Sequence, residues 1–253
     1  MFEVAADLAL LLVFAGFLAG FVDAIAGGGG LITVPALLLA GASPVEALAT
    51  NKLQGTFGSA TAALSYARAG KVDLRSQARM ALVSGAAGAA GAMVAHLIPA
   101  EVLRLIMPII LVAVALFFAL KPGLSDEDRV QRMTPALFTF TAVPLIAAYD
   151  GFFGPGTGSF FMLGFVMLAG YGVLKATAHT KLLNFASNFG SLLVFVFSGA
   201  TWWIVGLCMA LAQIAGAYVG AKLAMRIGAR LIKPLLVATS TAMAARLLWQ
   251  VWG

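Results

Sequence analysis

The sequence twice interrupts an apolar stretch with an aspartate followed by closely spaced glycines, first as Asp23-Ala-Ile-Ala-Gly-Gly-Gly-Gly30 and again as Asp150-Gly-Phe-Phe-Gly-Pro-Gly-Thr-Gly158. Glycine is unfavourable inside a helix and adopts backbone conformations that other residues avoid. Each stretch therefore predicts a helix that stops at the glycines and a second helix that starts after them.

The two turns belong to a longer internal repeat. Gly41 corresponds to Gly170, Lys52 to Lys181 and Gly70 to Gly199, so the offset stays at 129 residues between these positions. A constant offset indicates a duplicated unit. We therefore divide the chain into a first repeat at residues 1–120, a linker at 121–133 and a second repeat at 134–253.

The composition predicts a membrane protein. Hydrophobic residues make up 62% of the chain and charged residues 10%, against about 45–50% and about 25% in soluble domains. Cys208 is the single cysteine, which excludes an internal disulfide framework and a cysteine-rich metal site. The formal charge of +6 is concentrated near segment ends, which indicates membrane orientation and no nucleic-acid partner.

Ten apolar segments follow the duplication. They fall roughly at 7–22, 29–41, 45–68, 78–98 and 102–120, and again at 134–149, 157–170, 174–197, 203–225 and 234–252. About 20 residues are needed to cross the hydrocarbon core, so the first two segments of each repeat are short. The predicted fold is all-α and polytopic, with each repeat made of a short broken or re-entrant helix pair and three transmembrane helices.

Equivalent loops of the two repeats differ in charge. The loop after the third segment contains Arg68, Lys71 and Arg75 in the first repeat, whereas the second has uncharged residues 198–203. The positive-inside rule places the first loop in the cytoplasm and the second outside. Two similar units of opposite orientation predict an inverted repeat, which is common in secondary transporters. Both termini are then periplasmic.

The glycine turns are candidate anion sites. Amides of residues 27–30 and of Gly156, Thr157 and Gly158 are expected to be free at the starts of the following half-helices, where anions are favoured. Interrupted helices in both halves of a transporter point to its binding site. Close helix packing also explains membrane glycines, and it is the interpretation we prefer for Gly16, Gly20, Gly216 and Gly220.

Lys52 and Lys181 occupy the same register position near the start of the third segment of each repeat. Ionisable side chains within a membrane helix usually face the bundle interior or a cavity, although long ones also snorkel to the interface. Two inward lysines beside two half-helix N-termini predict a cationic pocket. A small multi-oxygen anion is its expected occupant.

Further polar residues surround these lysines. Asn51, Thr180 and Asn184 are expected to orient an anion; Gln54 is another candidate amide, and His179 titrates in the physiological range. The amides either donate to the anion or tie helices together. Asp23 and Asp150 pair with the lysines, cap the half-helices or carry a coupling proton.

The motifs also resemble those of a known family. Gly20-Phe-Val-Asp-Ala-Ile-Ala-Gly-Gly-Gly-Gly-Leu-Ile-Thr-Val-Pro35, Ala49-Thr-Asn-Lys-Leu53, Asp150–Gly158 and His179-Thr-Lys-Leu182 resemble the paired signatures of the TauE/SafE sulfite-exporter-like family. The resemblance covers nearly the whole chain. It implies a permease of the bacterial inner membrane for sulfur-containing or organic anions such as sulfite, sulfonates or sulfoacetate.

The expected function is therefore secondary transport of a small oxyanion by alternating access, without a cofactor or a bound metal and without enzymatic activity. A passive anion channel of the same fold is the alternative. The direction of transport, a coupling proton or counter-ion, and a homodimeric state stay open at the level of sequence.

Overall fold

The computed structural model describes residues 4–99, 101–103, 105–106, 109–110, 113, 127–128, 130–228 and 230. The regular elements assigned within these residues are all α-helices. In chain order they are α1 (Ala6–Ala26), α2 (Gly30–Leu39), α3 (Pro44–Arg68), α4 (Ala78–Leu97), α6 (Pro135–Phe140), α7 (Ala142–Phe152), α8 (Thr157–Met167), α9 (Val173–Ser198) and α10 (Trp203–Ile227). The predicted segment 234–252, most of 102–120 and most of the linker lie outside the described residues.

Five apolar helical stretches of the described chain are long enough to cross a membrane. They are Asp7–Ala26, Ala78–Leu97, Pro135–Phe152, Val173–Ser198 and Trp203–Ile227. Large apolar side chains also cover the outer surface, where Leu82, Leu211 and Phe197 are 75%, 70% and 88% exposed. Such a surface suits lipid and not water. The prediction of an all-helical multi-pass membrane protein is confirmed for the described residues.

The first segment of each half is longer than its hydropathy predicted. Helix α1 continues through Asp23 to Ala26, and α6 with α7 runs from Pro135 through Asp150 to Phe152. Both aspartates are buried and paired with lysines, so their charges are neutralised and the helices can continue past them within the membrane. The helix after each glycine turn is too short to cross a membrane alone, with 10 residues in α2 and 11 in α8.

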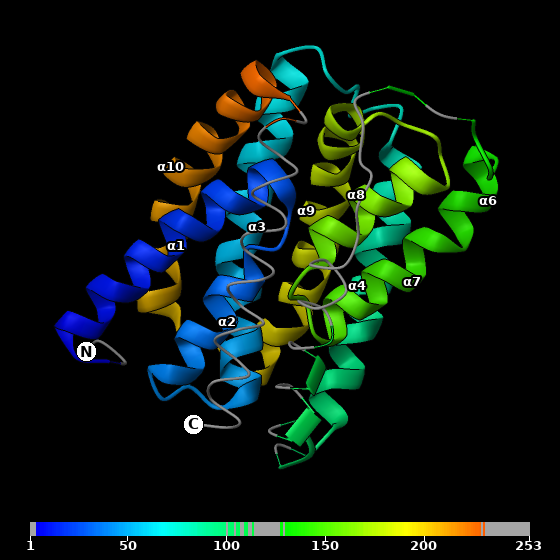
Figure 1. Ribbon diagram of the computed structural model, residues 1–253. Helices are drawn as coiled ribbons and strands as arrows, with labels where there is room; N and C mark the ends of the chain where they lie inside the picture. Colours follow the sequence, from blue (N-terminus) through cyan, green and yellow to red (C-terminus); the bar gives the residue numbers. More distant parts are fainter. Residues whose placement is uncertain are drawn as a thin grey trace.

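Helices α3 and α9 form the centre of the molecule and run in opposite directions, as the colour gradient along each shows (Figure 1). The start of α3 is fixed by Ser43, which precedes Pro44: its N–H donates to the Glu46 carboxylate at 2.7 Å, and its hydroxyl accepts from the Glu46 N–H. At the start of α9, the Gly172 N–H donates to Asp128 Oδ1 at 2.7 Å. Both central helices are thus anchored at their first turns.

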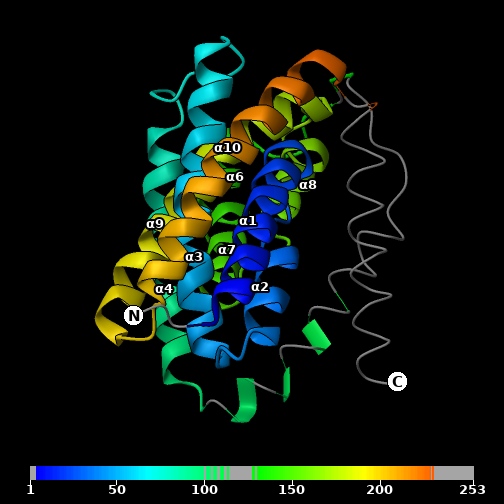
Figure 2. The same ribbon diagram turned by 90° about the vertical axis from the view of Figure 1, so that its left-hand side faces the viewer.

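The outer helices pair across the two halves. Helix α1 packs along α10, and α7 packs along α4 (Figures 1 and 2). A Cβ atom at Gly220 would lie 2.4 Å from Phe21 O, and one at Gly91 would lie 2.0 Å from Ala148 O. Any larger residue at these positions would push the helices apart. Cβ atoms at Gly16, Gly20 and Gly216 would likewise lie 2.8 Å or less from a backbone oxygen of the facing helix, so the packing interpretation of these glycines is confirmed.

Candidate functional site

The two glycine turns meet in the middle of the bundle. Helix α1 ends where Gly27 adopts a φ of +78° and donates its N–H to Asp23 O. Gly156, with a φ of +86°, precedes α8. A Cβ atom at Gly27 would lie 2.3 Å from Ser159 N, so the first turn contacts the start of α8 directly. Both turns need glycine for the left-handed backbone and for this close approach.

The lysine of the first half pairs with the aspartate of the second. Lys52 Nζ lies 2.8 Å from Asp150 Oδ1, with side chains 0% and 2% exposed. The other carboxylate oxygen accepts a hydrogen bond from Ser187 Oγ at 2.5 Å. Asp150 is therefore held at both oxygens, and the burial of one charge is offset by the other.

The lysine of the second half pairs with the aspartate of the first. Lys181 Nζ lies 3.6 Å from Asp23 Oδ2 and donates a short hydrogen bond to the Asp23 backbone oxygen. The carboxylate also accepts from the Gly29 N–H at 3.3 Å and from Asn184 Nδ2 at 3.4 Å. Of the roles left open for the two aspartates, pairing with the lysines is observed for both, and Asp23 also caps the start of α2 through the Gly29 N–H.

These pairs correct the expectation of a cationic pocket. Both lysines are fully buried and point inward rather than snorkelling, but each ammonium is matched by a carboxylate. The four charges sum to zero. Pairing is required because an unmatched ammonium buried in a membrane protein is costly.

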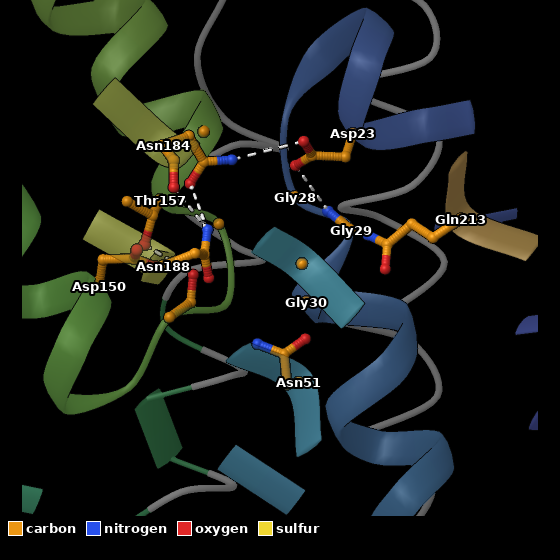
Figure 3. Close-up of a pocket in the computed structure, with 14 residues that line it drawn as sticks. Asp23, Gly28, Gly29, Gly30, Asn51, Asp150, Thr157, Asn184, Asn188 and Gln213 are labelled. Carbon is orange, nitrogen blue, oxygen red and sulfur yellow. Dashed lines mark hydrogen bonds between the residues drawn. The ribbon is translucent and has the colours of Figure 1, made fainter. Parts of the chain in front are cut away.

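A small polar cavity lies between the two turns (Figure 3). Asp23 and Asn184 point toward one another at its edge, and Asn51 and Gln213 enter from other helices. The space open to the centre of a water molecule is about 20 Å³, which holds about one water. The lining residues are Asp23, Gly28, Gly29, Gly30, Asn51, Gly55, Asp150, Gly154, Gly156, Thr157, Gly158, Asn184, Asn188 and Gln213.

Four glycine amides beside the cavity remain available. Among the described residues, no acceptor receives the N–H of Gly28, Gly30, Gly156 or Gly158. The expectation that all amides of both turns are free was wrong for three of them. The Gly27 N–H donates to Asp23 O, the Gly29 N–H donates to the Asp23 carboxylate, and the Thr157 N–H donates to Gly154 O.

Asn51 is oriented by its neighbours. Its Oδ1 accepts a hydrogen bond of 2.7 Å from Thr33 Oγ1 and a longer one of 3.4 Å from Gln54 Nε2. Its Nδ2 lies close to Gly30, since a Cβ atom at Gly30 would be 3.5 Å from it. The donor end of this amide therefore lies beside Gly30, which also lines the cavity.

Five predicted site residues do not line the cavity in this conformation. Lys52 and Lys181 lie behind the aspartates, and Gln54 lies behind Asn51. Thr180 is fully buried, with no hydrogen-bond partner for its hydroxyl among the described residues. His179 lies elsewhere: its Nδ1 contacts Lys175 O at 2.9 Å, and its ring packs on Tyr171 and Phe165.

Four residues that the predicted site did not include also line the cavity, namely Gly55, Gly154, Asn188 and Gln213. Gln213 is 4% exposed, and its Oε1 has no partner among the described residues. A single amide in the apolar stretch 203–225 was the signal, because polar residues within membrane helices usually face the interior. Asn188 lies one turn after Asn184 on the same face of α9 and donates to the Asn184 side-chain and backbone oxygens.

The family model described as "Sulfite exporter TauE/SafE" matches residues 12–247. The chain belongs to the TauE/SafE family. Its relatives include the "Probable membrane transporter protein ORF9" of Sinorhizobium sp, which is 58% identical over 98% of this chain and 95% of the relative.

Other TauE/SafE relatives have equally general names. The "Probable membrane transporter protein YfcA" of Escherichia coli K12 is 44% identical, over 100% of this chain and 94% of the relative. A "Probable membrane transporter protein" of Haemophilus influenzae is 41% identical over 99% of this chain and 98% of the relative. No solved structure matches the chain significantly. The resemblance inferred from the paired motifs is confirmed, and the chain is a TauE/SafE membrane transporter.

Proposed function

We propose that the protein is a secondary transporter of small sulfur-containing or organic oxyanions, which exports sulfite, a sulfonate or sulfoacetate by alternating access across the bacterial inner membrane. The observation that carries this proposal is the polar cavity between two interrupted helices, with free glycine amides at its wall.

The lining favours an oxyanion through hydrogen-bond donors. The free N–H groups of Gly30 and Gly158 lie at the first turns of α2 and α8, where the helix dipole favours negative charge. Asn51 Nδ2 faces the same space, and the Asn184, Thr157 and Gln213 side chains border it. Several oxygens on one central atom match several convergent donors.

The lysines balance charge from the second layer around the cavity. The Lys52 and Lys181 ammonium groups each hold a carboxylate that lines the cavity. An anion therefore meets two neutralised aspartates instead of two bare negative charges. The absence of an excess positive charge also keeps binding moderate, which a transporter needs for release.

Two inverted copies of one unit explain how the site opens alternately to each side. The α1–α10 contact at Phe21 and Gly220 has its counterpart in the α7–α4 contact at Ala148 and Gly91. The ion pairs are reciprocal in the same way: Lys52 of the first half pairs with Asp150 of the second, and Lys181 of the second half pairs with Asp23 of the first. This reciprocal pairing fits a pseudo-twofold axis through the cavity, with both termini periplasmic.

The cavity holds about one water, so a four-atom oxyanion needs it to widen. A carrier that changes shape during transport supplies this widening, whereas a passive channel needs a continuous open path.

Counterflow in proteoliposomes tests the function. Vesicles loaded with sulfite, methanesulfonate, sulfoacetate, taurine or acetate are diluted into labelled anion. We expect saturable uptake that is stimulated by a transported anion on the opposite side. Flux that is linear in concentration and indifferent to the opposite side identifies a channel, and equal flux in protein-free vesicles for every anion refutes both functions.

A further inference from the structure

The two crossed ion pairs are unequal, although their residues occupy matching positions in the repeats. The Asp150 side chain is 2% exposed and lies 2.8 Å from its lysine, whereas the Asp23 side chain is 12% exposed and lies 3.6 Å from its lysine. Lys181 directs its short hydrogen bond to the Asp23 backbone oxygen instead of to the carboxylate.

The sequence explains this inequality. Ser187, which donates to Asp150, corresponds at the offset of 129 to Gly58, which has no side chain. Gln213 fills the vacated space, since a Cβ atom at Gly58 would lie 2.6 Å from Gln213 Cγ. Among the described residues, Asp23 therefore receives no hydroxyl donor. The hydrogen bonds that its carboxylate accepts from these residues are two long ones, of 3.3 and 3.4 Å.

Charge balance in the cavity makes the weaker pair important. With the cavity empty, Lys52, Lys181, Asp23 and Asp150 carry a net charge of zero. A carrier reorients both empty and loaded, and an uncompensated charge inside the membrane opposes either step. A bound monovalent anion makes the site −1. One proton, taken up with the anion, restores zero.

We propose that Asp23 takes up this proton, so that each monovalent anion crosses together with one H⁺ in an electroneutral symport, while Asp150 stays ionised on Lys52. Export then proceeds when the outward anion gradient exceeds the inward pH gradient. The inference rests on the proposed transport function and adds its coupling ion. Protonating Asp150 would disrupt a 2.8 Å ion pair and a 2.5 Å hydrogen bond. Protonating Asp23 disrupts only its longer contacts.

The surroundings of Asp23 contain no competing carboxylate on the neighbouring described helices. From α9 it faces Lys181, and from α3 it faces Tyr66, whose hydroxyl donates to Ala24 O. Helices α2 and α8 contain no titratable side chain, and α10 contributes the neutral Gln213 to the same cavity. Asp150 lines the cavity as well, but its charge is held by Lys52 and Ser187.

The proton moves from water to the Asp23 carboxylate, and no covalent bond to the anion forms. Lys181 keeps its hydrogen bond to the Asp23 backbone oxygen and thereby stays in place when the carboxylate becomes neutral. Its positive charge then compensates the anion. On the other side of the membrane, the anion and the proton leave together and the Asp23–Lys181 pair re-forms.

Methanesulfonate is the appropriate probe, because it remains a monoanion at every pH used and does not cross lipid as a free acid. Purified protein is reconstituted in phosphatidylethanolamine–phosphatidylglycerol vesicles with equal labelled methanesulfonate on both sides. Valinomycin and equal K⁺ hold the membrane potential at zero while the interior is made one pH unit more alkaline. We expect about ten-fold accumulation inside, the equilibrium limit for one proton per anion. A potential imposed without a pH gradient should cause none.

The variant D23N should lose accumulation driven by the pH gradient but continue to exchange labelled for unlabelled methanesulfonate at a measurable rate. The matched variant D150N should keep the pH dependence in whatever flux it retains. Accumulation driven by potential alone in the wild type, or ten-fold accumulation in D23N, overturns the proposal. If D23N is not recovered in folded form, the wild-type measurements under a pH gradient and under a potential alone still test the proposal. Exchange without proton coupling refutes only this inference, whereas failure of the wild type to exchange any anion refutes the transport function and the inference with it.

Discussion

Lys52 Nζ lies 2.8 Å from Asp150 Oδ1, although the two residues are 98 positions apart in the chain. Each half of the protein thus supplies a buried charge that only the other half neutralises. The cavity is bordered by both glycine turns for the same reason, so neither half contains a complete site. The crossed ion pairs connect folding to the assembly of the binding site.

Breaking this pair on one side should destabilise the protein strongly. Lys52→Met leaves the Asp150 charge buried without its lysine, and D150N leaves the Lys52 ammonium unpaired. We expect each single variant to lose about 3–5 kcal/mol of unfolding free energy, measured by denaturant titration in mixed micelles. The double variant should lose clearly less than the sum of the two. Additive losses would mean that the two side chains do not interact in the folded protein.

Gly158→Ala should separate the two turns. A Cβ atom there would lie 2.9 Å from Gly27 Cα and 3.3 Å from Asp23 Oδ1. Because the Gly158 amide is a proposed donor, we expect anion counterflow to fall at least ten-fold. Gly164→Ala on the same helix is the control, since its nearest contact is an ordinary 3.4 Å and its flux should be near the wild-type value. Equal flux in both variants would remove the turn from the site.

Gln213→Met should separate stability from binding. Gln213 Oε1 is buried without a partner among the described residues, so an apolar side chain of similar length should leave thermal stability unchanged or higher. The half-saturation concentration for the transported anion should rise about ten-fold, the value of one hydrogen bond to a charged group. If the variant transports normally, Gln213 only fills the space beside Gly58 and does not bind the anion.

The contact between Asp128 and the start of α9 should depend on pH. The hydrogen bond from Lys175, together with that from the Gly172 N–H, holds the pKa of the Asp128 carboxyl below its ordinary value. Its stabilising contribution is therefore present above the ordinary carboxyl pKa and is lost as the pH falls through the lowered one.

In thermal unfolding, Asp128→Asn should be less stable than the wild type at pH 7, and the difference should vanish under strongly acidic conditions. Because the pair is exposed, the shift in midpoint should be small. Lys175→Gln should show part of the effect, since it keeps the Gly172 contact. A difference that persists in acid would assign the stabilisation to some other property of Asp128.

Much of the fold was accessible from sequence because the bilayer imposes simple rules. Apolar length located the membrane helices, and the glycine runs located the breaks that separate α1 from α2 and α7 from α8. The lengths of the first segments were misjudged because hydropathy treats Asp23 and Asp150 as costly charges. Their partners lie on other helices, and hydropathy does not detect pairing across the fold.

The sequence predicted most of the residues that form the site, but it did not predict how their charges are paired. The register placed Lys52 and Lys181 correctly at matched buried positions. It did not reveal that each ammonium meets the aspartate of the opposite half, because this requires knowing that α3 lies beside the end of α7 and α9 beside the end of α1. Gln213 was missed because its counterpart at the same offset is Ser84, whose hydroxyl donates to Leu183 O, so the repeat offers no matching amide.

The most direct test of the account is the location of a bound anion. Crystals grown with 2-bromoethanesulfonate allow the bromine to be found by anomalous scattering. We predict a peak beside the cavity, with sulfonate oxygens on the Gly30 and Gly158 amides and the surrounding helices moved apart to admit it. A cavity without a peak, with bromine only on the lipid-facing surface around Leu82 and Phe185 or near Arg68, would contradict the assignment of this cavity as the binding site.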